Sequence, residues 1–236
     1  MADLVVELAG GVRVVTGGGR ELRIASRKAL ALLACLAIRP GTAHARDFLA
    51  GLLWEDSDAE LARSSLRQAL AALRRALPAE CSDALRTDAS GVWLDAERAD
   101  SDVARLQALL RDASPGAVIE EAGRCAGELF EGLDPRSSAF ERWMDEQRRS
   151  FRRQLLDALE RAAAQCDAAG DLGGRVAALE QLTAMEPTNE RAHRELMDSL
   201  ARVGRYADAL KQYRTCRDLI SHNVQPPART ALAGVL

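Results

Sequence analysis

The sequence lacks the features of a membrane-spanning or secreted chain. No run of apolar residues approaches the roughly 20 that a transmembrane helix needs. The amino-terminal stretch MADLVVELAGG has neither the basic start nor the long apolar core of a signal peptide. These absences predict a cytoplasmic protein with no membrane partner.

Signatures of disulfide bonding, metal binding and catalysis are missing as well. The five cysteines are widely scattered, and none forms a Cys-x-x-Cys pair or has a histidine nearby at a metal-ligand spacing. The three histidines stand apart from acidic and nucleophilic motifs, and no glycine-rich phosphate loop precedes a helix. We therefore expect no disulfide framework, no metal site, no cofactor and no catalytic residue, so the protein is not predicted to be an enzyme.

Lysine and net positive charge are also scarce. Of the 32 basic residues only Lys28 and Lys211 are lysines, which is typical of a GC-rich bacterial coding sequence. With 47% apolar and 28% charged residues, the chain has the composition of an ordinary soluble protein. Its net charge of −3 argues against indiscriminate nucleic-acid binding, which usually needs a broad basic surface. Any contact with DNA must therefore come from local patterning.

The first 54 residues combine strand and helix patterns. Apolar residues alternate in three short segments separated by glycine turns, and this alternation predicts three antiparallel strands. The segments are 4–8, 12–14 and 22–24. Ser26 is placed to cap a helix that runs through Ile38, and a second short helix is predicted over 45–54.

A third helix and a hairpin follow. Ser57 and Glu60 have the spacing of a capping box, so the third helix should begin at about Asp58. After Pro78, strand-like segments on both sides of 89–91 predict a β-hairpin. Strands, three helices and a hairpin in this order predict a winged helix-turn-helix domain over residues 1–97, with a core of its own that should let it fold alone.

Residues 98–236 form the second predicted domain, which is helical almost throughout from Asp102 onward. The segments that begin at Gly170 and Gly204 lie 34 residues apart, the period of tetratricopeptide repeats. The repeat is degenerate, because Arg175 stands where the second copy has the small residue Ala209. The predicted fold class is mainly α with a small β part: an N-terminal winged helix-turn-helix followed by an all-α tetratricopeptide-like helical repeat domain.

The third predicted helix carries a concentration of arginine. Its segment LARSSLRQALAALRRAL, residues 61–77, holds four arginines and no carboxylate. On a wheel of about 100° per residue the leucines fall in one stripe, and the opposite face is basic, rich in donors and free of bulky apolar groups. A helix in the DNA major groove needs such a face. A solvated surface helix would show the same pattern, and only its place as the third helix before a hairpin favours DNA recognition.

These motifs together resemble one family of regulators. The segment WEDSDAELARSSLRQALAALRRAL is similar to the winged-helix part of the Streptomyces antibiotic regulatory protein (SARP) family, which couples an OmpR-type DNA-binding domain to a bacterial transcriptional activator domain. The segments GELFEGL (127–133), ERWMDEQRRSFRRQLLDALERA and GRYADALKQYRTCRDLI (204–220) resemble that activator domain. The resemblance implies a sequence-specific transcriptional activator that binds direct repeats in double-stranded DNA and self-associates on DNA. Its helical repeats would engage RNA polymerase or regulate the DNA-binding domain.

The resemblance also implies which residues contact DNA. Arg46 takes a phosphate-contacting role at the start of the second helix, and Arg86 and Ser90 take the wing role. The recognition-helix role falls on Arg63, Ser64, Arg67, Gln68, Arg74 and Arg75. One departure is Ala45, which stands where family members usually have a serine N-cap, so the second helix loses a cap worth on the order of 1 kcal/mol.

Two points stay open at this stage. The carboxylates just before the recognition helix, at positions 55, 56, 58 and 60, suit the positive end of the helix dipole as well as a contact with polymerase. A tetratricopeptide-like interaction scaffold, or a regulatory fragment of a larger regulator with weak or lost DNA binding, is the alternative function.

Overall fold

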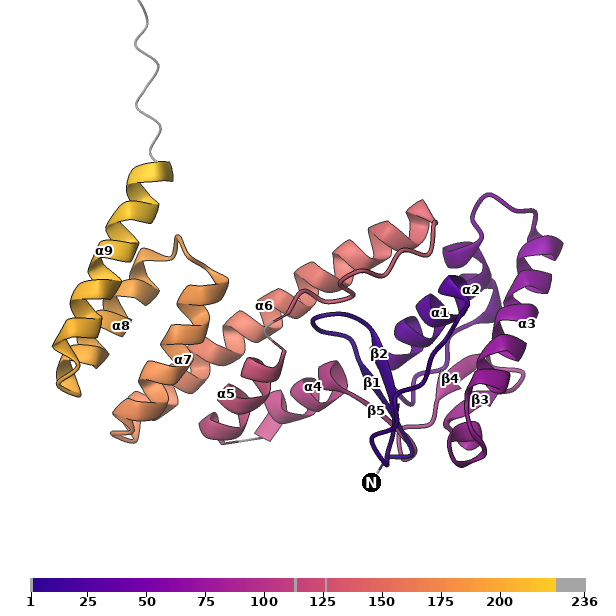
Figure 1. The fold of residues 1–236 in the computed structure, drawn as a ribbon, viewed down its shortest axis with the longest axis horizontal. Coiled ribbons are helices and arrows are strands. Elements are labelled where there is room, and N and C mark those ends of the chain that lie inside the picture. Colours follow the sequence, from indigo (N-terminus) through magenta and orange to yellow (C-terminus); the bar gives the residue numbers. More distant parts are fainter. Residues whose placement is uncertain (1, 113, 126, 224–236) are drawn as a thin grey trace, which may run out of the picture. The chain divides into compact units, whose positions relative to one another are not determined.

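The computed structural model describes residues 2–112, 114–125 and 127–223. The residues up to 101 form both strands and helices, and the described elements from residue 102 onward are helices (Figure 1). The end of the predicted activator domain, residues 224–236, lies outside the described residues. The elements are β1 (Leu4–Glu7), β2 (Arg13–Thr16), α1 (Arg27–Ala37), α2 (Arg46–Leu53), α3 (Ala59–Ala76), the 3-10 helix η1 (Ala79–Ala84), β3 (Leu85–Thr87), β4 (Val92–Leu94), β5 (Ala99–Ser101), α4 (Asp102–Asp112), α5 (Pro115–Arg124), α6 (Ser138–Ala168), α7 (Leu172–Met185), α8 (Glu190–Arg202) and α9 (Tyr206–Asn223).

Contacts divide the chain into two compact units. The first consists of Met1–Ala113 and Glu120–Leu155, and the second of Ser114–Ile119 and Leu156–Leu236. The first unit therefore extends past residue 97, where the sequence pattern changes. The boundary at residue 97 stays a prediction about where the DNA-binding part ends, whereas the packing boundary falls within α6.

The amino-terminal sheet has three strands in the order β2, β1, β5 (Figure 1). β1 pairs antiparallel with β2 and parallel with β5. The prediction of a strand at 22–24 is wrong: the backbone N–H of Leu22 donates to the Val14 carbonyl at 2.8 Å, but no strand forms there. The third strand comes from residues 99–101 instead. Local alternation indicates an extended segment without indicating its partner, so the parallel pairing was not visible in the sequence.

The three helices before the hairpin begin where the sequence predicts. Ser26 caps α1 with its side chain, and α2 follows Ala45, which makes no side-chain cap hydrogen bond. α3 is capped by Asp58, whose carboxylate accepts a hydrogen bond from the Leu61 N–H at 2.8 Å. Asp58 is thus the N-cap in place of Ser57, the residue expected from the capping-box spacing. A carboxylate at this position also suits the positive end of the helix dipole.

The hairpin predicted around 89–91 consists of β3 and β4, and it gains an additional partner. His44 and Val92 exchange two backbone hydrogen bonds of 2.9 and 3.0 Å. These bonds join the β3–β4 hairpin, which is the wing, to the chain just before α2. Gly91 allows this approach: its φ is +152°, and a Cβ atom there would lie 2.2 Å from the His44 carbonyl oxygen. Only glycine fits this position.

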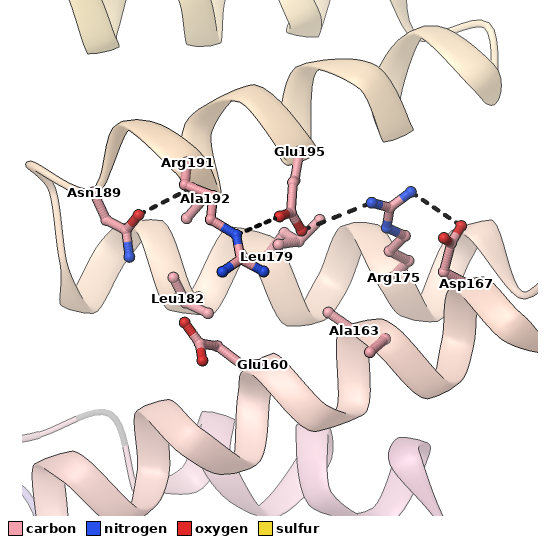
Figure 2. A pocket seen from close by; sticks show the side chains of 11 residues that line it. Glu160, Ala163, Asp167, Arg175, Leu179, Leu182, Asn189, Arg191, Ala192 and Glu195 are labelled. Carbon is pink, nitrogen blue, oxygen red and sulfur yellow. Dashed lines mark hydrogen bonds and ion pairs between the residues drawn. The ribbon is translucent and has the colours of Figure 1, made fainter.

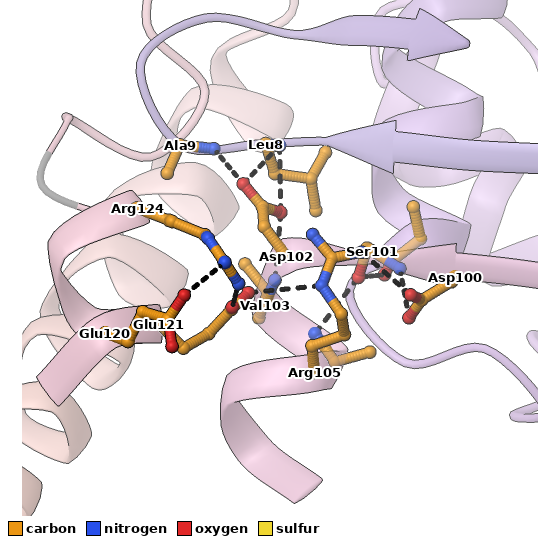
Figure 3. Close-up of polar contacts among 12 residues, drawn as sticks. Leu8, Ala9, Asp100, Ser101, Asp102, Val103, Arg105, Glu120, Glu121 and Arg124 are labelled. Atoms are coloured by element: carbon orange, nitrogen blue, oxygen red, sulfur yellow. Dashed lines mark hydrogen bonds and ion pairs between the residues drawn. The ribbon is translucent and has the colours of Figure 1, made fainter. Parts of the chain in front are cut away.

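The buried carboxylate of Asp102 closes the end of β1 (Figure 3). It accepts hydrogen bonds from the backbone N–H groups of Leu8 at 2.9 Å and Ala9 at 2.8 Å. Burial raises the pKa of this carboxyl, and the backbone donors oppose that shift. The adjacent Ser101 hydroxyl donates to the Ala37 carbonyl at 2.7 Å, so the start of α4 is fixed to both β1 and the end of α1.

A chain of ion pairs extends this polar cluster along α4 (Figure 3). Arg105 contacts Asp100 at 2.7 Å and the buried carboxylate of Glu121 at 3.1 Å. Glu121 in turn contacts Arg124 at 2.7 Å. Glu121 is therefore paired on both sides, as a buried carboxylate requires.

The first part of the GELFEGL motif packs on the end of β1. The Phe130 N–H donates to the Leu8 carbonyl at 2.7 Å, and the Gly10 N–H donates to the Glu128 carbonyl at 3.0 Å. A Cβ atom on Gly127 would lie 2.4 Å from the Gly10 Cα atom, so the two segments approach each other only because Gly127 has no side chain. This motif is thus explained by close backbone packing.

The turn between α2 and α3 is tied to the start of α6. Glu55 accepts hydrogen bonds from the Ser138 hydroxyl at 2.5 Å and the Ala139 N–H at 2.7 Å, and it pairs with Arg142 at 3.1 Å. The Ser137 hydroxyl donates to the carbonyl of Leu52, the penultimate residue of α2, at 2.8 Å. Glu55 therefore caps α6, a role not considered from the sequence.

The second unit contains the predicted helical repeats. α7, α8 and α9 lie side by side in antiparallel order (Figure 1). The predicted breaks at Gly170, Pro187 and Gly204 all fall between helices. Asp171 and Asn189 cap α7 and α8 with their side chains, which fixes where each helix begins.

We predict that Asp102→Ala lowers the free energy of unfolding of the first unit by about 2 to 4 kcal/mol, because the N–H groups of Leu8 and Ala9 lose their acceptor. Asp102→Asn should cost less, since it keeps one acceptor oxygen. Urea unfolding of the full chain measures the change. Asp145→Ala, which removes only an exposed pair with Arg148, is the matched control and should change stability by less than about 0.5 kcal/mol. Equal losses of stability in the two alanine variants would contradict the role of Asp102 as the acceptor at the end of β1.

Candidate DNA-binding surface

The arginine-rich helix α3 is amphipathic in the structure. The predicted leucine stripe is buried, with 2% of Leu66, 3% of Leu70 and none of Leu73 exposed, and Leu77 just beyond the helix end is buried too. Ser64 is half-buried, whereas the arginines of α3 and Gln68 are exposed. α3 thus fixes its apolar face in the core and presents its basic face outward.

Three arginines from the predicted set connect α2, α3 and the wing. Arg63 of α3 forms a two-point pair with Asp47 of α2, with Nε–Oδ1 at 2.7 Å and Nη2–Oδ2 at 3.1 Å. Arg74, in the last turn of α3, donates to the Thr87 hydroxyl of β3 at 2.6 Å. Arg46, at the start of α2, donates to the Asp88 carbonyl at the wing at 3.2 Å. These contacts bring the three predicted elements together on one surface.

The two predicted wing residues are engaged with carboxylates. Arg86 lies 3.3 Å from Asp95 and 3.8 Å from Asp83, so its charge is shared by two acids on the same unit. The Ser90 hydroxyl and N–H both donate to Asp88 Oδ1, at 2.5 and 2.7 Å. These hydrogen bonds lower the pKa of the Asp88 carboxyl, with the Ser90 hydroxyl as the main cause. They also shape the tip of the wing.

Arg67, Gln68 and Arg75 differ from the other predicted residues. All three are exposed on α3, and none of their side chains makes a hydrogen bond or ion pair with another residue in the described part of the chain. Their side chains share one face with Ala71, which is small and exposed. This face can approach a groove closely and still offers guanidinium and amide donors.

Asp47 and His44 also belong to this surface, although neither was predicted from the sequence. The hydrogen bond and charge of Arg63 lower the pKa of the Asp47 carboxyl. His44 stacks on Phe48 with ring centroids 6.0 Å apart, and its Nε2 atom is buried without a hydrogen-bond partner among the described residues. The position of Asp47 in the first turn of α2, directly after Arg46, was the available signal.

The second unit contains a separate polar cavity of about 280 Å³ between α6, α7 and α8 (Figure 2). Arg175, whose side chain is only 12% exposed, reaches Asp167 of α6 at 3.0 Å and Glu195 of α8 at 3.7 Å. The repeat copy has Ala209 at this position. Arg175 thus joins α6, α7 and α8 through a cluster of ion pairs that lines the cavity.

Membrane-spanning helices and clusters of metal ligands are absent from the described residues. None of the helices in 2–112, 114–125 and 127–223 is both long and apolar enough to cross a bilayer. Within the same ranges, no three histidine, cysteine or acidic side chains come together as metal ligands.

The chain combines a winged helix-turn-helix, whose third helix is basic, with a series of helical repeats that follows it in the sequence. The bacterial transcriptional activator domain family matches residues 94–233, which is more than half of the chain. The chain therefore belongs to this family, which confirms the resemblance to SARP-type proteins. None of the curated proteins compared with it matches significantly.

A solved structure has a similar fold. It is Mycobacterium tuberculosis EmbR in complex with a low-affinity phosphopeptide, with a TM-score of 0.61 and 22% sequence identity. The match covers 95% of this chain and 61% of the EmbR chain, so this chain spans less than two thirds of the length of that relative. At this identity the similarity shows the fold.

We predict that His44 makes the first unit less stable in mild acid. Burial, and secondarily the charge of Arg39, lowers the pKa of His44 below its ordinary value. The pKa of His44 in the unfolded chain is about 6.5, so its contribution to the free energy of unfolding should be fully present above that pH. Below it the free energy of unfolding should fall, because the unfolded chain binds a proton more readily than the folded chain does.

Urea unfolding at about pH 7.5 and about pH 5.5 measures this dependence. Carboxylates also begin to titrate in this range, so His44→Gln is the comparison that isolates the ring. The variant should lose less stability than the native chain between the two pH values. Parallel losses would show that the imidazole is not responsible.

Proposed function

We propose that the protein is a sequence-specific DNA-binding activator of transcription, with α3 as the recognition helix. The observation that supports this most directly is the outward face of α3. The side chains of Arg67, Gln68 and Arg75 on this face are exposed, and their donors have no partner among the described residues. Arginine can bind guanine O6 and N7 with two hydrogen bonds, and glutamine can bind adenine in the same way. A small residue, Ala71, between them permits close approach.

The other residues of the surface take positioning roles in this proposal. Arg46, at the start of α2, and Ser90, at the wing tip, lie where a DNA backbone flanking the recognition helix would pass. Arg63 and Arg74 hold α3 against α2 and the wing, and the exposed part of each guanidinium remains available for the DNA contact expected of the recognition helix. Arg86 is paired with two acids, so its phosphate contact would be weaker than that of Arg46.

Residues 98–236 are proposed as the part that engages RNA polymerase or regulates DNA binding, and residues 1–97 as the DNA-binding part. The family match over residues 94–233 supports this division of roles. The same family resemblance supports promoter sites made of direct repeats and a cytoplasmic protein. Because β5 and Asp102 lie beyond residue 97, a fragment that ends there should be less stable than one that ends at residue 155.

We predict that Arg67→Ala and Gln68→Ala each weaken binding to the preferred site by about 1 to 3 kcal/mol and hardly change binding to random DNA, because base-edge contacts carry the specificity. Arg46→Ala should weaken both and reduce the salt dependence by roughly one unit, as expected for a phosphate contact. Gel-shift titrations of a site selected from genomic DNA, at several salt concentrations, distinguish the two patterns. Equal losses on both DNAs for Arg67→Ala would overturn its base-contacting role. The absence of any shift would favour the interaction-scaffold alternative.

We also predict two direct half-sites whose centres lie about one helical turn, roughly 10 to 11 base pairs, apart. Two identical helices reach the same face of the duplex only at whole-turn spacing. Inserting about five base pairs between the half-sites should abolish cooperative binding, and inserting about ten should restore part of it. An inverted repeat bound by a stable dimer would contradict the head-to-tail arrangement.

A further inference from the structure

The pair between Asp47 and Arg63 places a carboxylate within the proposed DNA-binding surface. Asp47 lies in the first turn of α2, next to Arg46, and its side chain is 71% exposed. Arg63 projects from α3 and is 52% exposed. Both charges therefore face solvent on the surface that would meet DNA, where an acid opposes binding to phosphate.

The geometry of the pair leaves one edge of the guanidinium free. Asp47 takes the edge made by Nε and Nη2, at 2.7 and 3.1 Å. A guanidinium has five N–H donors, so the edge made by Nη1 and Nη2 remains available for a second two-point contact. Asp47 thus orients Arg63 without using all of its donors.

The two classes of DNA acceptor respond differently to such a pair. A phosphate is fully charged, so the nearby Asp47 carboxylate repels it and cancels much of the attraction of Arg63. A guanine edge is neutral and offers two acceptors in a fixed geometry, so it loses less from the carboxylate and gains from the fixed orientation of the guanidinium. The pair therefore weakens non-specific binding more than specific binding.

We propose that Asp47 is a specificity-determining residue of this regulator, which restrains Arg63 from phosphates and directs its free edge to a base. The inference rests on the proposed DNA-binding function and adds a residue that the family resemblance does not assign. It also explains why Asp47, an acidic residue, follows directly after Arg46, which is expected to attract the DNA backbone.

A purely structural role for Asp47 makes a different prediction. In the first turn of α2 the carboxylate also interacts favourably with the helix dipole, and Ala45 provides no cap. If this were its only role, Asp47→Asn would lower the stability of the fold and weaken binding to all DNA. Unfolding in urea, measured on the same samples, separates the two roles.

The test compares Asp47→Asn, Arg63→Gln and the double variant in the full chain. Each is titrated against a duplex carrying the selected site and against a random duplex of equal length, at several salt concentrations. Asp47→Asn should bind the random duplex about three- to tenfold more tightly, with a salt slope steeper by about one unit, because Arg63 becomes free to bind one more phosphate. Binding to the selected site should gain less, so discrimination falls.

Arg63→Gln should abolish the effect of Asp47→Asn in the double variant. Glu80→Gln is the matched control, because Glu80 forms a similarly exposed pair with Arg20 at 3.1 Å, outside the proposed surface, and its loss makes the same change in net charge. Equal gains on both duplexes, or the same gain from Glu80→Gln, would overturn the role of Asp47. If the native chain did not distinguish the two duplexes, the proposed function itself would fail, and the specificity role with it.

Discussion

The rest of the first unit depends on the hydrogen bonds that the backbone N–H groups at the end of β1 donate to Asp102. The strand is paired on one edge by β2 and on the other by β5, and beyond Glu7 the buried carboxylate of Asp102 takes over as acceptor. Unpaired backbone donors in this core would cost free energy comparable to lost hydrogen bonds. The winged helix therefore needs residues beyond its hairpin to complete its own sheet.

This requirement explains why the packing boundary differs from the boundary in sequence pattern. Composition and periodicity change near residue 97, where strands and turns give way to helices. Packing does not change there, because β5, the start of α4 and the strand-like contact at Phe130 all complete the same sheet region. The helical part of the chain thus contributes directly to the stability of the part that carries α3.

The distribution of charge on the surface follows a second constraint. Acidic and basic residues are about equally numerous in residues 1–97, so DNA attraction cannot come from net charge. Carboxylates pair with Arg63 and Arg86, and Arg67 and Arg75 have no such partner among the described residues. Arg67 and Arg75 thus lie together on the exposed face of α3, which the proposed function assigns to base contacts.

The sequence predicted what depends on local periodicity and missed what depends on distant partners. The helices, the buried face of α3 and the hairpin were all predicted, because apolar spacing and turn residues determine them locally. The strand expected at 22–24 was wrong, since alternation alone cannot show that residues 99–101 provide the partner of β1. Asp58 and Ser57 are both good N-caps, and only the path of the chain decides between them. The contacts of the site residues with DNA stay a prediction. Their ion pairs join residues that are distant in the sequence, so the sequence alone did not predict them.

Glu55 joins the two predicted domains. It lies in the turn between α2 and α3, and its carboxylate contacts the start of α6, which belongs to the matched activator domain. Its carboxylate accepts from Ser138 and Ala139, and the Ser138 hydrogen bond is the main cause of its lowered pKa. A partner that bound this turn through Glu55 would have to replace the cap of α6. A displacement of the start of α6 would likewise leave the turn before α3 without its anchor. The turn before α3 is therefore fixed by hydrogen bonds to the start of α6, the longest helix of the described residues.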